Sequence, residues 1–272
     1  MTTAAPIIQA IAAEAAAAMG RTQVAPFSAR HPGLSVDDAY AVTAEVRRLR
    51  QARGEITVGR KIGFTNRTIW EQYKVYAPIW GDMYDTTVRD VGTRFEFALG
   101  SIPEPLIEPE IVFGIDRAPS PDMDETALLG CIDWVAHGFE IVQSIFPKWQ
   151  FTLPDTIAAG GLHAALFVGP RHAIAERSAA EWTGALTGFE IALHRNGALI
   201  DRGKAEFVLD GPLSALRHLV GLLARDPHNP PLRAGEIVTT GTVTKAFPIA
   251  ASQTWTTTLS GIALTPLAAT FV

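Results

Sequence analysis

The sequence has one cysteine, no cluster of basic residues and no long uninterrupted apolar run. Because Cys131 has no possible partner, the chain cannot form an internal disulfide or a thiolate metal cage, and this is typical of a reducing compartment. A net charge of −5 without a basic cluster makes nucleic acid and anionic membranes poor partners. No apolar run approaches the ~20 residues that a membrane-spanning helix needs.

Two further absences concern targeting and familiar catalytic motifs. Residues 7–19 are rich in alanine, but Glu14 interrupts them and no basic segment precedes them, unlike a secretory signal peptide. We therefore expect a cytoplasmic protein. The sequence also contains no P-loop, GxGxxG, GxSxG or HExxH motif.

The residues that are present suffice for a large core. Of 272 residues, 47% are hydrophobic and 19% charged, which excludes gross disorder and allows one large domain or two modest ones. The first third has a helical pattern, since apolar residues at positions 7, 8, 11 and 15 share one face and Gly20 is a suitable stop. Ser35 is the predicted N-cap, with Asp38 at the third helical position, of a helix over residues 39–53.

From about residue 57, short β-branched runs alternate with glycine and proline. Asn196-Gly197 predicts a hairpin turn between residues 191–195 and 198–200. Helices are expected over residues 124–139 and 212–224. The predicted strands are residues 57–62, 107–115, 165–168, 190–195, 206–209, 236–240, 254–259 and 269–272. We therefore predict an α+β fold, with a small helical N-terminal region over residues 1–56 and a β-rich catalytic domain over residues 57–272.

A pair of carboxylates lies within one predicted strand. Side chains alternate faces along a strand, so Glu108 and Glu110 point the same way, while Ile107 and Ile111 point to the other face. Two buried carboxylates repel each other and need a cation to remain ionised, and a hard divalent ion with oxygen ligands meets that need. The alternative is a solvated strand face, with Pro109 marking the edge of a sheet.

His137 and Glu140 form a second candidate, because a separation of three residues allows both to bind one metal on a helix. Gly138, however, is a typical helix end, and a histidine at a helix C-terminus is favoured by the helix dipole. We prefer that interpretation for His137. If residues 139–142 instead form a strand, Glu140 lies among apolar neighbours and is another buried carboxylate.

Two weaker signals suggest contacts with an anion. Lys61 stands in a β-type run close to Gly59 and Gly63, where the backbone can approach a ligand and a cation can bind a carboxylate. A lysine on a strand is most often a solvated edge residue, however. Thr240, Gly241 and Thr242 offer hydroxyl and backbone N–H donors at a strand end, which suits a small anion but also occurs in ordinary strand exits.

The glycine-rich segment over residues 155–163 ends in a histidine. The unperturbed pKa of His163, ~6.5, suits general acid/base catalysis. A packed core histidine is the alternative.

Five segments, taken in order, resemble those of a known family. The sequence is similar to the 2-keto-4-pentenoate hydratase and 4-oxalocrotonate decarboxylase branch of the fumarylacetoacetate hydrolase superfamily, from about Asp37 to the C-terminus. Each segment is weak singly, and all five in register are specific to the superfamily but not to one of its reactions. The segments are GRKIGFT at 59–65, VYAPIWG at 75–81, IEPEI at 107–111, EIV at 140–142 and DTIA at 155–158.

The resemblance implies a mixed β roll and a Mg²⁺ or Mn²⁺ ion held by Glu108, Glu110 and Glu140. It also implies that Lys61 lies near the oxo-acid end of the substrate and that the turn at residues 240–242 faces the same pocket. Members of the family form homo-oligomers and act on small 2-oxo acids.

The sequence departs from the family at one loop. Related hydratases usually continue the DTIA segment with Asp-Asn-Ala-Ser-Ser, whereas residues 159–163 here are Ala-Gly-Gly-Leu-His. His163 thus becomes a candidate replacement proton donor, and we predict that His163 and Lys61 are the catalytic residues. The expected reaction is hydration of a 2-hydroxy-2,4-dienoate. Decarboxylation of a 4-oxalocrotonate-type acid is the alternative, a C–C hydrolase is less favoured, and loss of activity is disfavoured because all three glutamates and Lys61 are present.

Overall fold

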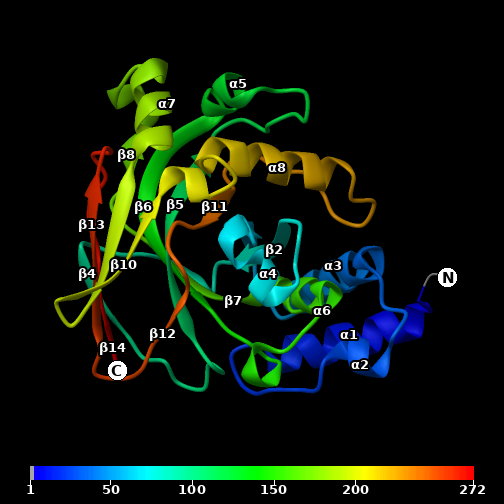
Figure 1. Ribbon diagram of the computed structural model, residues 1–272. Helices are drawn as coiled ribbons and strands as arrows, with labels where there is room; N and C mark the ends of the chain where they lie inside the picture. The colour runs from blue at the N-terminus through cyan, green and yellow to red at the C-terminus, as the bar shows by residue number, and fades with distance from the viewer. Residues whose placement is uncertain (1–2) are drawn as a thin grey trace.

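The computed structural model describes residues 3–272 as helices packed around two β-sheets (Figure 1). This architecture confirms the predicted α+β class. Short helices and 3₁₀ turns lie between the strands. In chain order, the elements up to β5 are α1 (Ala5–Ala18), α2 (Phe27–Arg30), α3 (Val36–Ala52), β1 (Thr57–Gly63), η1 (Arg67–Ile69), α4 (Trp70–Tyr73), β2 (Ile79–Tyr84), β3 (Val88–Asp90), β4 (Arg94–Phe97) and β5 (Leu106–Ile115).

The second half of the chain supplies the remaining strands and helices. Its elements are α5 (Glu125–Leu129), β6 (Ile132–Val142), η2 (Pro147–Trp149), α6 (Leu153–Ala158), η3 (Gly160–Leu162), β7 (His163–Val168), β8 (His172–Ala173), η4 (Ile174–Glu176), α7 (Ala179–Gly188), β9 (Glu190–Arg195), β10 (Ala198–Lys204), η5 (Ala205–Phe207), α8 (Pro212–Ala224), β11 (Ile237–Thr242), β12 (Phe247–Pro248), β13 (Thr254–Ser260) and β14 (Ala268–Phe271).

Among residues 3–272, the larger sheet runs β2-β1-β11-β5-β6-β7-β3, with β12 beside β5 and β8 beside β6. This sheet curls. One buried cluster on its inner face contains side chains from strands that are far apart in the sheet. They are Met83 on β2, Val112 on β5 and Leu166 on β7. The curl thus brings the inner face of β1 towards that of β6, which is the region where the candidate site residues lie.

The smaller sheet runs β10-β9-β13-β14-β4 and packs against the outer face of the larger one. Trp255 and Phe271 from the smaller sheet meet Phe139 and Ile141 from β6 in one buried cluster. The predicted hairpin at Asn196-Gly197 is confirmed between β9 and β10. The predicted strand over residues 206–209 is wrong, because residues 205–207 form the 3₁₀ turn η5 before α8.

The predicted helix over residues 124–139 is also wrong for most of its length. Only α5 is helical, with Asp124 as its N-cap, and the chain then enters strand β6. Residues 132–142 pair with β5 on one side and with β7 on the other. Long-range pairing of a β-branched and aromatic run therefore overrides the helical start signal at Asp124.

The N-terminal helices pack against the larger sheet near Ile79 of β2, Leu106 of β5 and Val142 of β6. The predicted cap of α3 is confirmed, since Ser35 Oγ accepts from the N–H of Asp38 and Asp38 Oδ2 accepts from the N–H of Ser35. Asp155 at the start of α6 accepts hydrogen bonds from the N–H and hydroxyl of Ser28 in α2. Residues of α1 and α3 share a buried cluster with Ile145, Phe146 and residues 157–159. The division of the chain at residue 56 stays a prediction.

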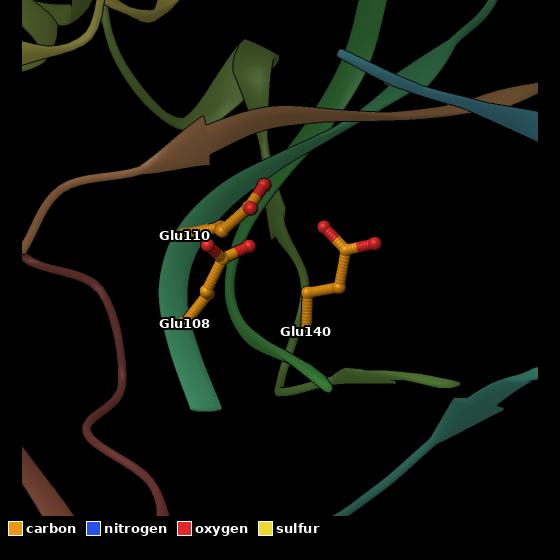
Figure 2. Close-up of side chains that lie close together, drawn as sticks. All are labelled: Glu108, Glu110 and Glu140. Carbon is orange, nitrogen blue, oxygen red and sulfur yellow. The ribbon is translucent and has the colours of Figure 1, made fainter. Parts of the chain in front are cut away.

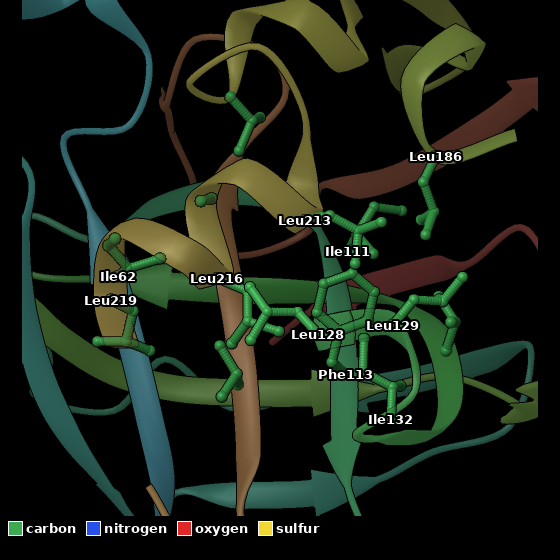
Figure 3. Close-up of a cluster of buried hydrophobic side chains, with 14 of the residues drawn as sticks. Ile62, Ile111, Phe113, Leu128, Leu129, Ile132, Leu186, Leu213, Leu216 and Leu219 are labelled. Atoms are coloured by element: carbon green, nitrogen blue, oxygen red, sulfur yellow. The ribbon is translucent and has the colours of Figure 1, made fainter. Parts of the chain in front are cut away.

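Helix α8 covers the outer face of β1, β11 and β5, as Figure 3 shows. Its buried leucines pack with Ile62 of β1 and with Ile111 and Phe113 of β5. These strand residues alternate with Lys61 and with Glu110, so the same strands bury apolar side chains outside and carry charged ones inside. Within residues 3–272, no helix is both long and apolar enough to cross a membrane.

We predict that Leu216→Ala destabilises the protein by about 2–5 kcal/mol, because Leu216 is fully buried on the face of α8 that packs against the sheet, and its truncation leaves a cavity. Leu199→Ala is the matched control, since Leu199 on β10 is 49% exposed and its loss is expected to cost less than about 0.5 kcal/mol. Urea unfolding of both variants measures the difference. Equal losses for the two leucines would contradict the assignment of this cluster as the core.

Candidate metal and substrate site

Three glutamates meet on the inner face of the larger sheet. Glu108 lies directly opposite Glu140 in the antiparallel pairing of β5 with β6, and Glu110 stands two residues further along β5. Residues that are paired across strands point to the same side, so the register itself brings the three carboxylates together. Figure 2 shows them turned towards one another, and one oxygen of each lies within 4.8 Å of the others. Glu110 and Glu140 are fully buried, and Glu108 is half-buried.

Pro109 lies between two of these glutamates in a central strand, so its predicted role as an edge marker is wrong. Its carbonyl accepts from the N–H of Val243, so its own nitrogen faces the same side. On that side the pairing of β5 with β11 is irregular between Thr239 and Thr242. A proline, which has no N–H, is tolerated there because the regular pairing of the two strands is interrupted at this position.

Each of the two buried carboxylates has one oxygen with a hydrogen-bond partner and one without, among the described residues. Glu110 Oε2 accepts from the N–H of Gly241 at 2.8 Å, and Glu140 Oε1 lies 2.7 Å from Nδ1 of His163. No residue between 3 and 272 gives a hydrogen bond to Glu110 Oε1 or Glu140 Oε2. Buried polar atoms are rarely left in this state.

The charges of the site do not balance within the protein. Burial, together with repulsion from Glu140, raises the pKa of Glu108 to about 7, against the attraction of Lys61. Burial and the other two glutamates raise the pKa of Glu110 well above its usual value. The pKa of Glu140 is lowered, because Lys61 and His163 outweigh its burial. Among residues 3–272, Lys61 supplies the one ammonium in an ion pair with these carboxylates, and its partner is Glu140, whose Oε2 lies 3.3 Å away.

A divalent cation with a preference for oxygen ligands fits this arrangement. It would remove the repulsion among Glu108, Glu110 and Glu140 and would be bound by the two buried oxygens that have no hydrogen bond. The donor set contains no thiolate, and carboxylate oxygens are the ligands that Mg²⁺ and Mn²⁺ prefer. The three glutamates therefore form a divalent-metal site.

A pocket of about 870 Å³, including its open mouth, lies beside this site. Glu108 and Lys61 stand in its wall, so the metal site and the pocket are continuous. The wall is otherwise a mixture of polar groups and large apolar side chains. Its remaining residues are Gly63, Phe64, Thr65, Asn66, Ile69, Gln72, Tyr73, Leu106, Val142, Trp149, Gly161, Leu162, Gly241, Thr242, Lys245, Ala246 and Phe247.

Lys61 is buried on β1, with its ammonium held between two elements. Nζ donates to the carbonyl of Gly161 at 2.9 Å and lies 3.3 Å from Glu140 Oε2. The three glutamates raise its pKa against the effect of burial, so it remains protonated at neutral pH. The prediction of a solvated edge lysine is wrong, because β1 pairs with both β2 and β11.

The turn at Thr240, Gly241 and Thr242 contributes in three different ways. Gly241 and Thr242 line the pocket, whereas Thr240 is outside its lining and donates to the carbonyl of Ile111 at 3.0 Å. Gly241 has φ +96°, and a Cβ there would lie 1.8 Å from Thr65 Oγ1. Only glycine can therefore occupy this position and direct its N–H at Glu110.

The two histidines of the sequence hypotheses lie in different places. His137 is on β6 but points away from the glutamates, with Nδ1 3.0 Å from the carbonyl of Glu110 and Nε2 2.9 Å from Thr257 Oγ1. Its preferred assignment to a helix C-terminus is wrong, and burial lowers its pKa to about 4. The alternative, in which Glu140 is a buried strand carboxylate, is confirmed. His163 contacts Glu140 but is outside the lining of the pocket.

An aromatic wall of the pocket was not predicted. Phe64 and Tyr73 lie 5.8 Å apart, and Tyr73 lies 6.4 Å from Trp149, between ring centroids. These residues come from a loop after β1, the short helix α4 and the turn η2, and no periodic pattern links them. A single sequence therefore contains no signal that could have joined them.

No profile of a known protein family matches the chain. It is similar to 4-oxalocrotonate decarboxylase from Pseudomonas sp. strain CF600, with 30% identity over 237 residues, 85% of this chain and 84% of that protein. It is also similar to 2-hydroxyhexa-2,4-dienoate hydratase from Comamonas testosteroni, with 26% identity over 240 residues, 88% of each chain.

Solved structures agree with these sequence relatives. 4-Oxalocrotonate decarboxylase from Pseudomonas putida G7, complexed with magnesium and adipate, has a TM-score of 0.89 and 25% identity, and covers 100% of this chain and 99% of its own. Fumarylpyruvate hydrolase from Pseudomonas aeruginosa, in complex with Mn²⁺ and pyruvate, has a TM-score of 0.60 and 15% identity, over 80% of this chain and 90% of its own. The second likeness concerns the fold alone.

The fold and the three-carboxylate centre define a metal-dependent enzyme of the fumarylacetoacetate hydrolase superfamily. The chain belongs to the branch of that superfamily that contains 2-keto-4-pentenoate hydratases and 4-oxalocrotonate decarboxylases. Both activities are lyase reactions, so the enzyme is a lyase.

We predict that Mn²⁺ raises the melting temperature more at pH 8 than at pH 5.5. Below their raised pKa values Glu108 and Glu110 are protonated, and the metal must displace those protons before it binds. The gain is thus small at pH 5.5 and increases as the pH passes about 7. With the metal at about 100 times its Kd, binding adds about 2.7 kcal/mol, or about 5–10 °C.

Thermal unfolding with and without Mn²⁺ measures this gain. Glu110→Gln is expected to lose it at both pH values, while Glu206→Gln, at an exposed position on η5, keeps it. A gain that is independent of pH, or one that persists in Glu110→Gln, would contradict the assignment of these ligands.

Proposed function

We propose that the enzyme is a divalent-metal-dependent hydratase that adds water to a 2-hydroxy-2,4-dienoate, or to the 2-oxo-enoic acid formed from it, and yields a 4-hydroxy-2-oxo acid. The observation that supports this proposal is the continuity of the carboxylate centre with a pocket whose wall also carries large apolar side chains. The carboxylate centre and Lys61 suit a charged 2-oxo acid group, and the apolar side chains suit a short hydrocarbon tail. Hydratases are among the relatives of the chain.

The metal, held by Glu108, Glu110 and Glu140, would supply a Lewis acid that stabilises negative charge on the 2-oxo acid. Lys61 supplies a fixed positive charge beside it. Of the three ammonium hydrogens, one is donated to Gly161 and a second faces Glu140, which leaves one for a substrate oxygen in the pocket. Because its raised pKa keeps Lys61 protonated, it acts as a donor rather than as a base.

The pocket wall both excludes water and provides polar contacts. Phe64, Trp149 and Phe247 exclude bulk water around the tail of the substrate, which strengthens electrostatic interactions at the charged end. Gln72 and Tyr73 provide polar atoms that can hold the water molecule that is added. Burial raises the pKa of Tyr73, so its hydroxyl remains neutral and can both donate and accept.

Decarboxylation of a 4-oxalocrotonate-type acid is the second candidate. It is supported by the likeness to two decarboxylases and by Lys245, an exposed cation in the pocket wall that could bind a second carboxylate. Both reactions need a charge-stabilising centre next to the 2-oxo acid, so the groups further out in the pocket decide between them. We further propose that the enzyme is a homo-oligomer, as the family resemblance implies, and that it is cytoplasmic.

Incubation of the protein with Mg²⁺ and either 2-hydroxypenta-2,4-dienoate or 4-oxalocrotonate separates the two candidates. For the hydratase we expect loss of the dienol absorbance without release of CO₂, and proton NMR should show a 4-hydroxy-2-oxo acid. Release of CO₂ from 4-oxalocrotonate, with the dienoate left unchanged, would instead identify a decarboxylase.

We predict that Lys61→Met lowers kcat/KM about 10²–10³-fold, because the fixed donor at the charged end of the substrate is lost. Lys204→Met, at an exposed position on β10, is the control and should leave kcat/KM unchanged. Steady-state kinetics at saturating Mg²⁺ tests this, with circular dichroism to verify folding. Wild-type kcat/KM in a folded Lys61→Met protein would exclude Lys61 from the reaction.

A further inference from the structure

His163 lies behind the metal site rather than in the substrate pocket. It is 5% exposed at the start of β7, and it lines a small separate cavity together with Arg50, Asp82 and Tyr84. Glu140 stands between His163 and Lys61, because its two oxygens face Nδ1 of His163 and Nζ of Lys61 respectively. A substrate in the pocket therefore meets Lys61 and the metal centre, and not the imidazole ring.

Both ring nitrogens of His163 already have partners. Nδ1 lies 2.7 Å from Glu140 Oε1, and Nε2 lies 3.0 Å from Thr87 Oγ1. An ionised carboxylate can only accept, so Nδ1 carries the hydrogen and donates it to Glu140. Thr87 is itself held by Tyr84, since its hydroxyl oxygen accepts from the backbone N–H of that residue at 3.2 Å, and its one hydroxyl hydrogen can be donated to Nε2. The imidazole ring is thus fixed in orientation from both sides.

This contact determines which oxygen of Glu140 has no hydrogen bond. With Oε1 occupied by His163, Oε2 is the atom left without a hydrogen bond among the described residues, and it faces Lys61. On the neighbouring strand, the N–H of Gly241 acts on Glu110 in the same way, leaving Oε1 free. The protein therefore holds each buried carboxylate by one oxygen and presents the other.

The loop before His163 supports the same arrangement. Gly160, Gly161 and Leu162 all have φ near +65°, and at Leu162 this conformation is unfavourable because it carries a side chain. The turn places the carbonyl of Gly161 against Lys61 and the ring of His163 against Glu140. One short loop thus holds both members of the Lys61–Glu140 ion pair.

We propose that His163 is a positioning residue for the metal site: it fixes the carboxylate of Glu140 so that Oε2 is directed at the cation, and it does not exchange protons with the substrate. Thr87 fixes the ring of His163 in turn. The inference rests on the metal centre of the proposed function and replaces the sequence hypothesis of a proton donor. It is independent of whether the reaction is hydration or decarboxylation.

The test is Mn²⁺ binding, measured by isothermal titration calorimetry without substrate. Removal of a hydrogen-bond partner behind a metal ligand typically weakens binding 10–100-fold, and we expect His163→Ala to raise the Kd for Mn²⁺ by this factor. His163→Asn retains an N–H close to the position of Nδ1 and should bind within about threefold of wild type. His172→Ala, a half-buried histidine whose Nε2 is 3.1 Å from Thr265 Oγ1, is the control and should bind normally.

Kinetics as a function of Mn²⁺ concentration separates the two roles. A positioning role predicts that His163→Ala recovers most of its kcat at saturating Mn²⁺, whereas a proton donor would leave kcat low at any metal concentration. Normal Mn²⁺ affinity in folded His163→Ala, or a low kcat that metal cannot restore, would overturn the proposal.

Two further outcomes are also decisive. If His163→Ala does not fold, His163→Asn decides the matter, and a loss of affinity of tenfold or more in the folded Asn variant contradicts positioning by Nδ1. If the wild-type protein itself fails to bind Mn²⁺, the metal centre of the proposed function is wrong. That result is distinct from a wild-type site that binds normally and does not depend on His163.

Discussion

Repulsion among three carboxylates is the constraint around which the inner face of this protein is arranged. The pairing of Glu108 with Glu140 across two central strands places like charges opposite each other, a contact that destabilises a sheet unless another group compensates for it. Glu110 adds a third negative charge in a fully buried position. Three donors contact the carboxylates: the ammonium of Lys61, the imidazole N–H of His163 and the backbone N–H of Gly241. These donors hold the carboxylates in place but do not neutralise them, and the remaining charge is what selects a divalent cation.

The rest of the fold makes this concentration of charge possible. The strands that carry the glutamates and Lys61 inwards also carry Ile62, Ile111 and Phe113 outwards, where they pack beneath α8. A second cluster joins β6 to the smaller sheet through Phe139, Ile141 and Trp255. Burial on the outer face therefore stabilises the same strands whose inner face is unfavourable without metal. This separation of the two faces follows from the alternation of side chains along a strand, and it explains why the site lies in the centre of the sheet and not in a loop.

The loop at residues 159–163 has a different relation to the site from the one that its sequence suggests. It lacks the polar side chains that related hydratases usually have there, yet it provides two polar contacts, the Gly161 carbonyl to Lys61 and the His163 ring to Glu140. Successive positive φ angles make this possible, because they turn a backbone carbonyl towards the ammonium. The loop thus contacts the charged centre through a backbone carbonyl and an imidazole ring, while Gly161 and Leu162 form part of the pocket wall. It is in that wall, with its aromatic residues and Lys245, that hydratase and decarboxylase chemistry would be distinguished.

The sequence by itself determined the α+β class, the cap of α3, the hairpin at Asn196-Gly197 and the common face of Glu108 and Glu110, because each follows from local spacing. The family resemblance added Glu140 to the pair. The local sequence pattern gave a wrong prediction for residues 130–139, because a helical start signal precedes a strand there. The prediction for His137 was wrong for the same reason, since this residue lies on the face of β6 opposite the glutamates. Only the tertiary structure decided that Glu140 stands opposite Glu108, that the ring of His163 contacts this carboxylate instead of the pocket, and that Phe64, Tyr73 and Trp149 form one wall. These contacts join residues far apart in the chain, and strand register and sheet curvature, which set them, depend on the packing of the whole molecule.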